Sequence, residues 1–248
     1  MLIATGVRFE IVEGEQYLST RPCVIIGNHQ SELDVLVLGT VFPPYCSVTA
    51  KSSLKKIPFL GWFMALSGTV FIDRGDKVGA IKAFEGAAEE MNRHRQCVFI
   101  FPEGTRSYAR GPELGAFKKG AFHLAVKAGV DIVPVVCGNY SGVLDIGQRR
   151  FRGGRIPLKS TYQTWSIGAM QYIDPIRVLM NPTVLPPIPT KCLISADVEE
   201  LTRTTRDKML AELISLTESP LGQKAAKPLA SSEEELSVRR AAGMHVQQ

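Results

Sequence analysis

The sequence predicts a single α/β domain with a largely parallel central sheet flanked by helices. Short apolar segments of strand length alternate along the chain with longer segments whose apolar residues recur at helical spacing, and that alternation is typical of strand–helix–strand units. The chain has 248 residues, of which 45% are hydrophobic and 21% are charged, so it is long enough to bury one full core. No internal repeat divides it.

Runs of apolar and β-branched residues predict the strands. Residues 7–11 alternate apolar with charged side chains, which indicates a half-buried strand, whereas residues 23–27 are continuously apolar, which indicates a fully buried one. By the same criteria, further strands are expected at 47–50, 69–72, 97–101 and 132–137, with an edge strand at 161–167.

The helices are expected at 35–41, 77–94, 120–128 and from about residue 197 onward. In the segment 77–94, apolar residues including Ile81, Ala88 and Met91 recur on one face, which is typical of an amphipathic helix. Asp197 and Glu200 have the spacing of a capping box, so they are expected to begin the last helix.

Charge and composition restrict the class of partner. The chain has 29 Lys and Arg against 24 Asp and Glu, a formal net charge of +5, which suits an anionic substrate or a lipid surface. Because no basic run is interleaved with aromatic residues, no nucleic-acid partner is expected. The composition turns polar and aperiodic near the end, so we expect a folded domain at 1–217 and a disordered tail at 218–248.

The five cysteines are scattered, and none forms a C-x-x-C pair. Three of them lie inside apolar, strand-like runs. This usage predicts reduced, mostly buried thiols in a cytosolic environment and argues against a disulfide framework. The cysteines are Cys23, Cys46, Cys97, Cys137 and Cys192.

The longest apolar stretch, residues 57–72, leaves two interpretations open. The N-terminal residues do not have the pattern of a secretory signal. No run reaches the roughly 18 apolar residues that indicate a membrane span, and the stretch at 57–72 is interrupted by a proline and two glycines. It is either buried core or a segment that contacts a bilayer interface, where Lys51, Lys55 and Lys56 would meet anionic headgroups.

His29 and Asp34 follow a predicted buried strand, within the sequence GNHQSELDVL. Five residues rotate about 500° around a helix, so the two side chains cannot meet on one helical face. They can meet if His29 lies in the strand-to-helix turn and Asp34 in the first helical turn. Asp34 would then orient the imidazole, and His29 would act as a general base toward a hydroxyl. The alternative is that Asn28 and Asp34 cap the helix and His29 is a turn residue.

Two further predicted strands end in charged residues. GTVFIDR places Asp73 and Arg74 at a strand end, and FPEGTRS places Glu103 and Arg106 on either side of Gly104. Ligand sites in open α/β sheets form beyond the carboxyl ends of the strands, so these clusters are expected to converge on the His29 turn. A guanidinium group matches the oxygens of a phosphate. Either arginine alone could instead form a surface ion pair.

Other site chemistries fit the sequence poorly. A serine hydrolase is not expected because no G-x-S-x-G motif is present. The glycines at 115–120 are spaced like a phosphate loop, but Ala121 occupies the position of its lysine. His29, Asp34 and Glu103 could hold a metal ion in principle, yet no second histidine lies at ligand spacing, so no metal site is expected.

Four blocks of this sequence resemble, in order and spacing, the motifs of glycerolipid acyltransferases of the 1-acyl-sn-glycerol-3-phosphate (lysophosphatidic acid) type. The blocks are N-H-x-x-x-x-D at 28–34, GTVFIDR at 68–74, FPEGTRS at 101–107 and IVPVV at 132–136. The segments SLKKIPFLGWFMALSG and FKKGAFHLA are similar to those of fungal members. The resemblance covers about residues 7–136 and implies a glycerol-phosphate acyltransferase-like fold.

The resemblance implies transfer of an acyl chain from acyl-CoA to the free hydroxyl of 1-acyl-sn-glycerol 3-phosphate, forming phosphatidic acid without a covalent acyl-enzyme or a cofactor. His29 would be the general base, Asp34 its partner, and Pro134 would shape the site or the acyl pocket. The acceptor and its phosphate would be bound by Arg74, Glu103, Gly104, Thr105 and Arg106. Alternatives are another acceptor, such as glycerol 3-phosphate or a different lysophospholipid, and a non-catalytic lipid-binding module.

Family members carry an apolar anchoring segment upstream of the first block, whereas 28 residues precede His29 here. The resemblance implies a membrane surface as partner, at the cytosolic face of the endoplasmic reticulum. Attachment is expected to be peripheral, or integral if an upstream segment is missing. The sequence does not predict the oligomeric state.

Overall fold

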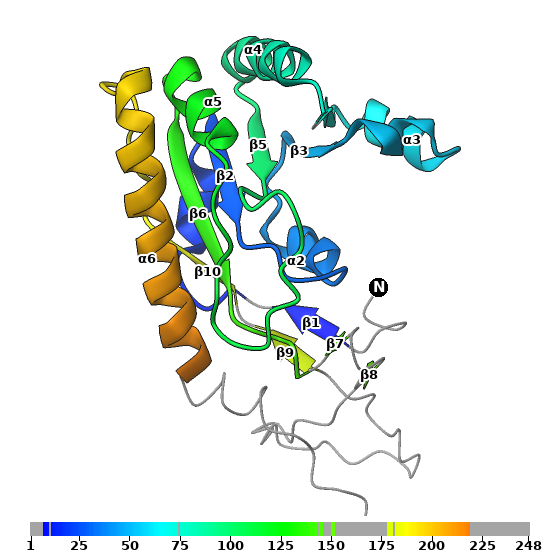
Figure 1. The fold of residues 1–248 in the computed structure, drawn as a ribbon, viewed down its shortest axis with the longest axis vertical. Helices are drawn as coiled ribbons and strands as arrows, with labels where there is room; N and C mark the ends of the chain where they lie inside the picture. The colour runs from blue at the N-terminus through cyan, green and yellow to red at the C-terminus, as the bar shows by residue number, and fades with distance from the viewer. Residues whose placement is uncertain are drawn as a thin grey trace, which may run out of the picture.

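A six-stranded sheet with the strand order β10-β6-β2-β5-β3-β4 forms the centre of the computed structural model (Figure 1). The structure describes residues 7–9, 11–73, 75–142, 144–145, 150–151, 178–180 and 182–218. The strands of this sheet are β2 (Cys23–Gly27), β3 (Cys46–Lys51), β4 (Val70–Ile72), β5 (Cys97–Ile100), β6 (Asp131–Cys137) and β10 (Pro182–Val184). All pair in parallel except β10, which is antiparallel to β6. The predicted α/β fold with a largely parallel sheet is confirmed.

The central strands are buried on both faces, which explains their continuously apolar sequences. Every residue of β2 and β5 is buried, and β6 is buried after its first residue. The register places Ile26 of β2 opposite Ile100 of β5 and Pro134 of β6. The carboxyl ends of these three strands therefore lie side by side.

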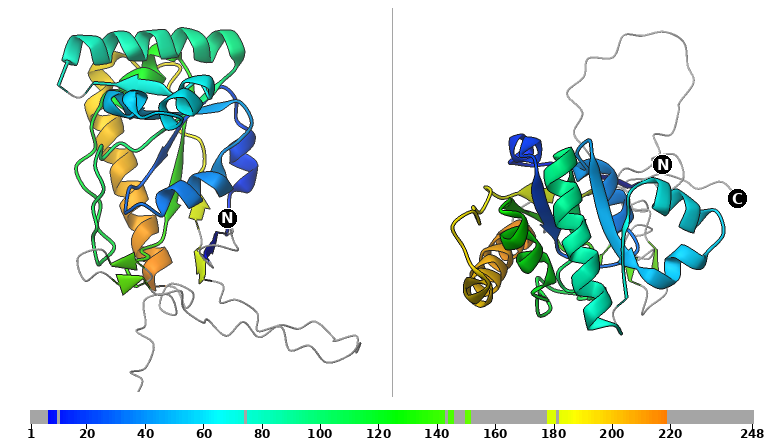
Figure 2. Two further views of the ribbon diagram at one scale, coloured as in Figure 1. Left: turned by 90° about the vertical axis from the view of Figure 1, so that its right-hand side faces the viewer. Right: turned by 90° about the horizontal axis from the view of Figure 1, so that it is seen from above.

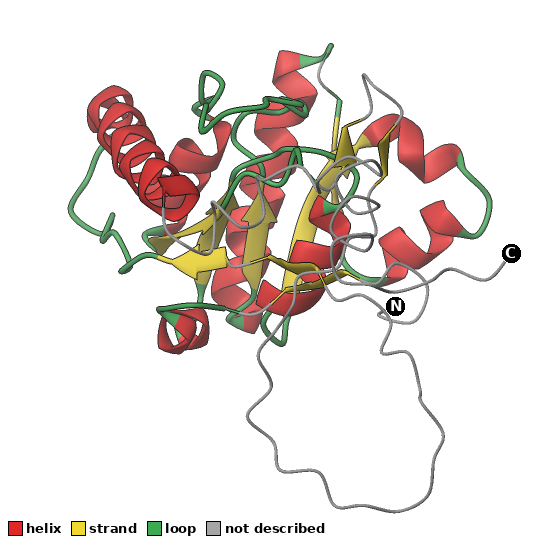
Figure 3. Cartoon of the chain, turned by 90° about the horizontal axis from the view of Figure 1, so that it is seen from below, coloured by secondary structure: helices red, strands yellow, loops and turns green. Residues whose placement is uncertain are grey.

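Helices cover both faces of the sheet (Figure 3). They are α2 (Asp34–Val41), α3 (Leu60–Leu66), α4 (Lys77–His94), α5 (Gly120–Ala128) and α6 (Val198–Glu218), with short 3-10 helices η1 (Glu15–Ser19), η2 (Ser52–Lys56) and η3 (Ser195–Asp197). Helices α4, α5 and α6 pack on one face, where Ile26, Met91 and Phe122 belong to one core cluster. Helix α2 packs on the other, where Val37 joins Ile25 in a second cluster.

Helix α3 projects away from the body of the domain (Figures 1 and 2). Only Gly61 of this helix is buried, whereas Phe59, Trp62, Phe63 and Leu66 are largely exposed. The buried-core interpretation of residues 57–72 is therefore wrong for α3. It holds in part for β4, whose residues are half-buried.

Three of the predicted elements differ from the structure or lie outside it. The first predicted strand is shorter, as β1 (Val7–Phe9), and pairs with β9 (Val178–Met180) in a separate two-stranded sheet. A further pair joins β7 (Leu144–Asp145) to β8 (Arg150–Phe151). The predicted strand at 161–167 and the tail after Glu218 lie outside the described residues.

The predicted capping box between Asp197 and Glu200 is wrong. Asp197 is the last residue of η3, and its Oδ2 accepts a hydrogen bond from the backbone N–H of Ile194 at 2.8 Å. Glu200 instead accepts hydrogen bonds from the Arg203 guanidinium one turn later. Because a 3-10 turn precedes α6, the carboxylate of Asp197 caps that turn.

The cysteines have the state that the sequence predicts. All five are free thiols, four of them buried and Cys192 exposed. Cys23 and Cys97 lie on neighbouring strands with their Sγ atoms 3.4 Å apart. They belong to the core that supports the sheet and lie at the strand ends opposite the His29 turn.

Truncation of Phe122 should destabilise the domain far more than truncation of Phe63, because Phe122 is fully buried and Phe63 is 68% exposed. We expect Phe122→Ala to lower the free energy of unfolding by about 3–5 kcal/mol. Phe63→Ala should change it by less than about 0.5 kcal/mol. Urea unfolding followed by circular dichroism measures both values, and equal losses would contradict the packing described here.

Candidate functional site

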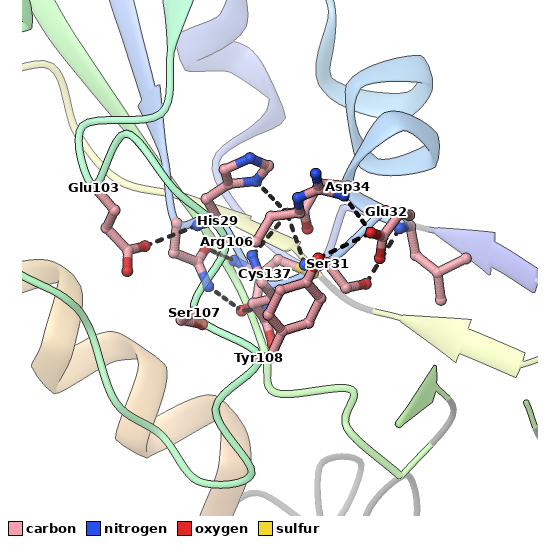
Figure 4. A network of polar contacts seen from close by, with 12 residues as sticks. His29, Ser31, Glu32, Asp34, Glu103, Arg106, Ser107, Tyr108 and Cys137 are labelled. Carbon is pink, nitrogen blue, oxygen red and sulfur yellow. Dashed lines mark hydrogen bonds and ion pairs between the residues drawn. The ribbon is translucent and has the colours of Figure 1, made fainter. Parts of the chain in front are cut away.

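His29 and Asp34 meet across the turn that joins β2 to α2. His29 lies two residues beyond the end of β2, and Asp34 is the first residue of α2. The imidazole Nδ1 lies 2.7 Å from Asp34 Oδ2 (Figure 4). The Asp34 side chain is 3% exposed, whereas the His29 side chain is 22% exposed. The contact predicted from the spacing is present, and it leaves Nε2 as the ring nitrogen without a partner among the described residues.

Both oxygens of the buried Asp34 carboxylate accept hydrogen bonds. Besides the imidazole, Oδ2 accepts from the backbone N–H groups of Gln30 at 2.7 Å and Ser31 at 3.1 Å. Oδ1 accepts from the Tyr140 hydroxyl at 2.5 Å. A buried charge is stable only when such donors replace water, so the conformation of the whole turn depends on this carboxylate.

Tyr140 connects the turn to the segment after β6. Its hydroxyl donates to Asp34 and accepts hydrogen bonds from the backbone N–H and the Oγ of Ser31, each at 3.1 Å. Burial, together with the negative charge of Asp34, raises the pKa of Tyr140 well above its usual value. The phenol therefore stays protonated and remains a donor to the carboxylate.

Two side-chain amides join the same turn to the end of β6. The Asn28 amide donates to the Cys137 carbonyl and accepts from the Cys137 N–H, both at 2.9 Å. Gln30 Nε2 donates to the carbonyls of Cys137 and Gly138, both at 3.0 Å. Asn28 thus extends the β2–β6 pairing with its side chain. The alternative in which Asn28 caps the helix is wrong.

The imidazole lies flat against an aromatic ring. The rings of His29 and Phe101 stack with centroids 4.1 Å apart and planes 17° from parallel. Phe101 follows β5 directly and packs edge-on against Phe99 inside that strand. With Asp34 at one nitrogen and Phe101 at one face, the orientation of the imidazole is fixed.

Glu103 and Gly104 build the loop after β5. Glu103 is 5% exposed, and its two oxygens accept from the backbone N–H of His29 at 2.8 Å and of Gly115 at 2.9 Å. Gly104 has φ +69°, and a Cβ there would lie 2.8 Å from Lys118 Nζ, so the position favours glycine. The structure shows Glu103 positioning the backbone of His29. Its predicted contact with the acceptor stays a prediction.

Arg106 lies beside this turn, where it forms an ion pair. Its guanidinium contacts Glu32, which also accepts from the Tyr108 hydroxyl at 2.9 Å (Figure 4). The ion-pair alternative therefore describes Arg106 in this structure. The Arg106 side chain is 40% exposed, so its face remains accessible. Thr105 is exposed next to it, and Arg74 lies outside the described residues.

A cavity of about 1260 Å³ opens between α4, α5 and the ends of β3, β4 and β5. Phe101 and Gly104 line this cavity, so the cavity extends to the aromatic ring that stacks on His29. The wall combines apolar side chains such as Ile81, Phe84 and Leu124 with charged ones of both signs: Lys118, Lys119, Lys127, Asp73, Asp76 and Glu85. Lys119 and Lys127 form ion pairs with Glu199 and Glu85. Pro134 is buried in β6 and does not line this cavity. The predicted contribution of Pro134 to an acyl pocket stays a prediction.

Comparisons with known proteins show which family this chain is similar to. A family model described as Acyltransferase matches residues 10–138. The 1-acyl-sn-glycerol-3-phosphate acyltransferase of Saccharomyces cerevisiae is 39% identical over 220 residues, 89% of this chain and 64% of that protein. The human 1-acyl-sn-glycerol-3-phosphate acyltransferase beta is 34% identical over 87% of this chain and 68% of its own length.

The chain belongs to the acyltransferase family. The crystal structure of the 1-acyl-sn-glycerophosphate (LPA) acyltransferase PlsC from Thermotoga maritima has a TM-score of 0.60 and 23% identity, covering 86% of this chain and 73% of that one, which supports the fold. This acyltransferase-family chain spans slightly less than two thirds of the yeast relative. The matched region, residues 10–138, contains the His29 turn, the β5 loop and β6.

Four residues of this candidate site had no predicted role in it, although three of them lie inside the quoted motif blocks: Asn28, Gln30, Phe101 and Tyr140. Asn28 and Gln30 flank His29, and Phe101 and Tyr140 follow strand ends, as the predicted residues do. The position of a polar or aromatic residue just beyond a buried strand could therefore have indicated that it belongs to the site. Among the described residues, no group of three His, Cys, Asp or Glu side chains is arranged to hold a metal ion.

Replacement of Tyr140 by Phe should change the pH dependence of stability. Below pH about 10, the ordinary pKa of tyrosine, Tyr140→Phe should be less stable by about 1–3 kcal/mol because buried Asp34 loses a donor. Above it, tyrosine ionises in the unfolded wild type but stays neutral in the folded one. The free energy of unfolding of the wild type then falls with pH, whereas that of the variant has no such contribution. The difference in free energy of unfolding between the two proteins therefore shrinks by about 1.4 kcal/mol per pH unit.

Urea unfolding of both proteins from pH 7 to 11.5 measures this difference. Tyr45→Phe is the matched control, because that ring is 71% exposed. A difference between wild type and Tyr140→Phe that does not vary with pH would contradict the protonated donor.

Proposed function

We propose that this chain transfers an acyl chain from acyl-CoA to the free hydroxyl of 1-acyl-sn-glycerol 3-phosphate, forming phosphatidic acid in phospholipid biosynthesis. The observation that carries the proposal is the imidazole of His29, which buried Asp34 orients through Nδ1 and which stacks on Phe101, a residue of the cavity wall. The names of its relatives support the choice of acceptor. The proposal needs no metal or other cofactor.

In the proposed reaction, His29 Nε2 takes the proton of the acceptor hydroxyl as its oxygen attacks the thioester carbonyl. A C–O bond forms, the C–S bond breaks, and the imidazolium returns the proton to the departing sulfur. Asp34 stabilises the imidazolium through Nδ1. No residue forms a covalent bond to the acyl group. General-base action of this kind contributes about 10²–10⁴-fold, and positioning of the two substrates supplies the rest.

The acceptor phosphate would bind at Arg106, where it would replace Glu32. The guanidinium already contacts one carboxylate oxygen there, and a phosphate offers the same geometry with more charge. Thr105, Gly104 and Arg74 complete the proposed acceptor site. Glu103 contributes by holding the backbone of His29.

The donor would occupy the cavity beside Phe101. Its apolar wall suits a fatty acyl chain, and three lysines of the lining suit the phosphates of coenzyme A: Lys118, Lys119 and Lys127. Because acceptor and product are membrane lipids, the proposal places the chain at a membrane surface, on the cytosolic face of the endoplasmic reticulum.

The proposal is tested by supplying the purified chain with labelled acyl-CoA and a panel of acceptors. We expect phosphatidic acid as the main product. His29→Ala should lower kcat by about 10²–10⁴-fold because the base is removed. His94→Ala should retain wild-type turnover, because His94 is exposed at the end of α4. A preference for glycerol 3-phosphate would overturn the assignment of the acceptor, and full activity of His29→Ala would remove His29 from the mechanism.

Replacement of Arg106 by Gln should weaken binding of the acceptor more than it slows turnover. Loss of hydrogen bonds to a charged group of about 1.5–3 kcal/mol corresponds to a KM for the acceptor raised about 10–100-fold. Steady-state kinetics compare the effect of the substitution on KM for lysophosphatidic acid and for monoacylglycerol. Since only lysophosphatidic acid has a phosphate, a larger effect on its KM identifies the phosphate contact. Arg203→Gln, an exposed arginine of α6, is the matched control. Equal effects on both acceptors would exclude a phosphate contact.

A further inference from the structure

Helix α3 and the residues just before it carry an apolar surface that the rest of the described chain leaves uncovered. We define this α3 surface by its six exposed members: Ile57, Phe59, Leu60, Trp62, Phe63 and Leu66. The exposed fraction reaches 79% for Phe59 and 89% for Leu66. Single exposed apolar residues are common, but a contiguous group of this size marks an interaction site.

The α3 surface is built to face outward. Gly61, the buried residue of α3, packs so closely on η2 that a Cβ there would lie 2.2 Å from the Lys55 carbonyl oxygen. Phe59 has φ +62°, which is rare for an aromatic residue, and its ring packs edge-on against Trp62 with centroids 5.7 Å apart. The helix is thus seated on η2 through its glycine, and the aromatic rings remain on the outside.

Three exposed lysines lie in or just before η2, the element on which α3 packs. Between residues 35 and 72 the sequence contains no Asp or Glu, and its charged residues are three lysines: Lys51, Lys55 and Lys56. All three are exposed, in η2 or directly before it. Lysines next to an aromatic and aliphatic surface are complementary to an anionic lipid headgroup layer over hydrocarbon.

We propose that the α3 surface inserts into the interface of a bilayer that contains anionic lipid, with the three lysines in the headgroup layer. Tryptophan and phenylalanine suit this depth because they combine large apolar area with tolerance of the headgroup region. No described helix has the length and apolar character that crossing a bilayer requires.

Membrane contact through α3 would also help the reaction, an inference that rests on the proposed function. The chain leads from α3 through Gly68 directly into β4, and Ile72 and Asp73 at the end of β4 line the same cavity as Phe101, the residue that stacks on His29. Insertion of α3 would hold that end of the cavity near the lipid surface. Acceptor and product could then exchange with the bilayer over a short path.

Vesicle cosedimentation of the full chain tests the proposal. With vesicles of phosphatidylcholine and phosphatidylserine, we expect Phe59→Ser/Trp62→Ser/Phe63→Ser to bind about tenfold or more weakly than wild type. Lys55→Glu/Lys56→Glu should lose the preference for anionic over pure phosphatidylcholine vesicles. Val12→Ser and Lys208→Glu, exposed changes outside the α3 surface, should bind as wild type.

Tryptophan fluorescence reports insertion independently. In a Trp165→Phe background, Trp62 is the remaining tryptophan, and its emission should shift to shorter wavelength when anionic vesicles are added. Circular dichroism confirms that each variant is folded. Wild-type vesicle binding by the triple variant, or no binding by wild type, overturns the proposal. Self-association of wild type that the triple variant abolishes would instead identify a second copy of the chain as the occupant.

Turnover separates this inference from the proposed function. With a short-chain acceptor below its micellar concentration, the triple variant should react at the wild-type rate, because no bilayer is needed. Vesicle binding through α3 without any acyl transfer would count against the proposed reaction alone. Normal transfer without vesicle binding would count against the α3 proposal alone.

Discussion

The buried carboxylate of Asp34 is the group on which the site depends. A charge on a side chain that is 3% exposed is tolerated only when protein donors replace water. Here the donors come from the imidazole, two backbone N–H groups of the turn and a phenol that follows β6. The turn and the end of β6 must therefore both be in place before the imidazole can be oriented. The sheet register, which puts these strand ends side by side, meets that requirement.

A second buried carboxylate, that of Glu103, holds the backbone of the site in place. Glu103 accepts from the N–H of His29 and of Gly115, and the Ser107 N–H donates back to the His29 carbonyl at 2.9 Å. Arg206 of α6 then holds the Gly115 loop by donating to its carbonyl at 2.9 Å. Contacts thus run from the last helix to the main chain of His29, so this helix supports the site without touching it.

The fold and the meeting of the β2 and β5 ends at His29 and Glu103 could be predicted from sequence because they follow from burial and from chain order. The helix 77–94 and the His29–Asp34 contact were predicted correctly for that reason. The partners of Asp34 that come from distant segments could not be, since nothing local in the sequence pairs Tyr140 with a residue 106 positions earlier. The same limit applies to α3, because an apolar run reads alike whether it faces a core or the outside.

The imidazole offers one exchangeable nitrogen to the outside, because Asp34 occupies the other and Phe101 covers one face of the ring. Under the proposed reaction, the alcohol and the sulfur must each visit that same atom, one to give up a proton and the other to collect it. Both substrates then have to be seated together on one side of the ring, which predicts a ternary complex in place of ping-pong exchange.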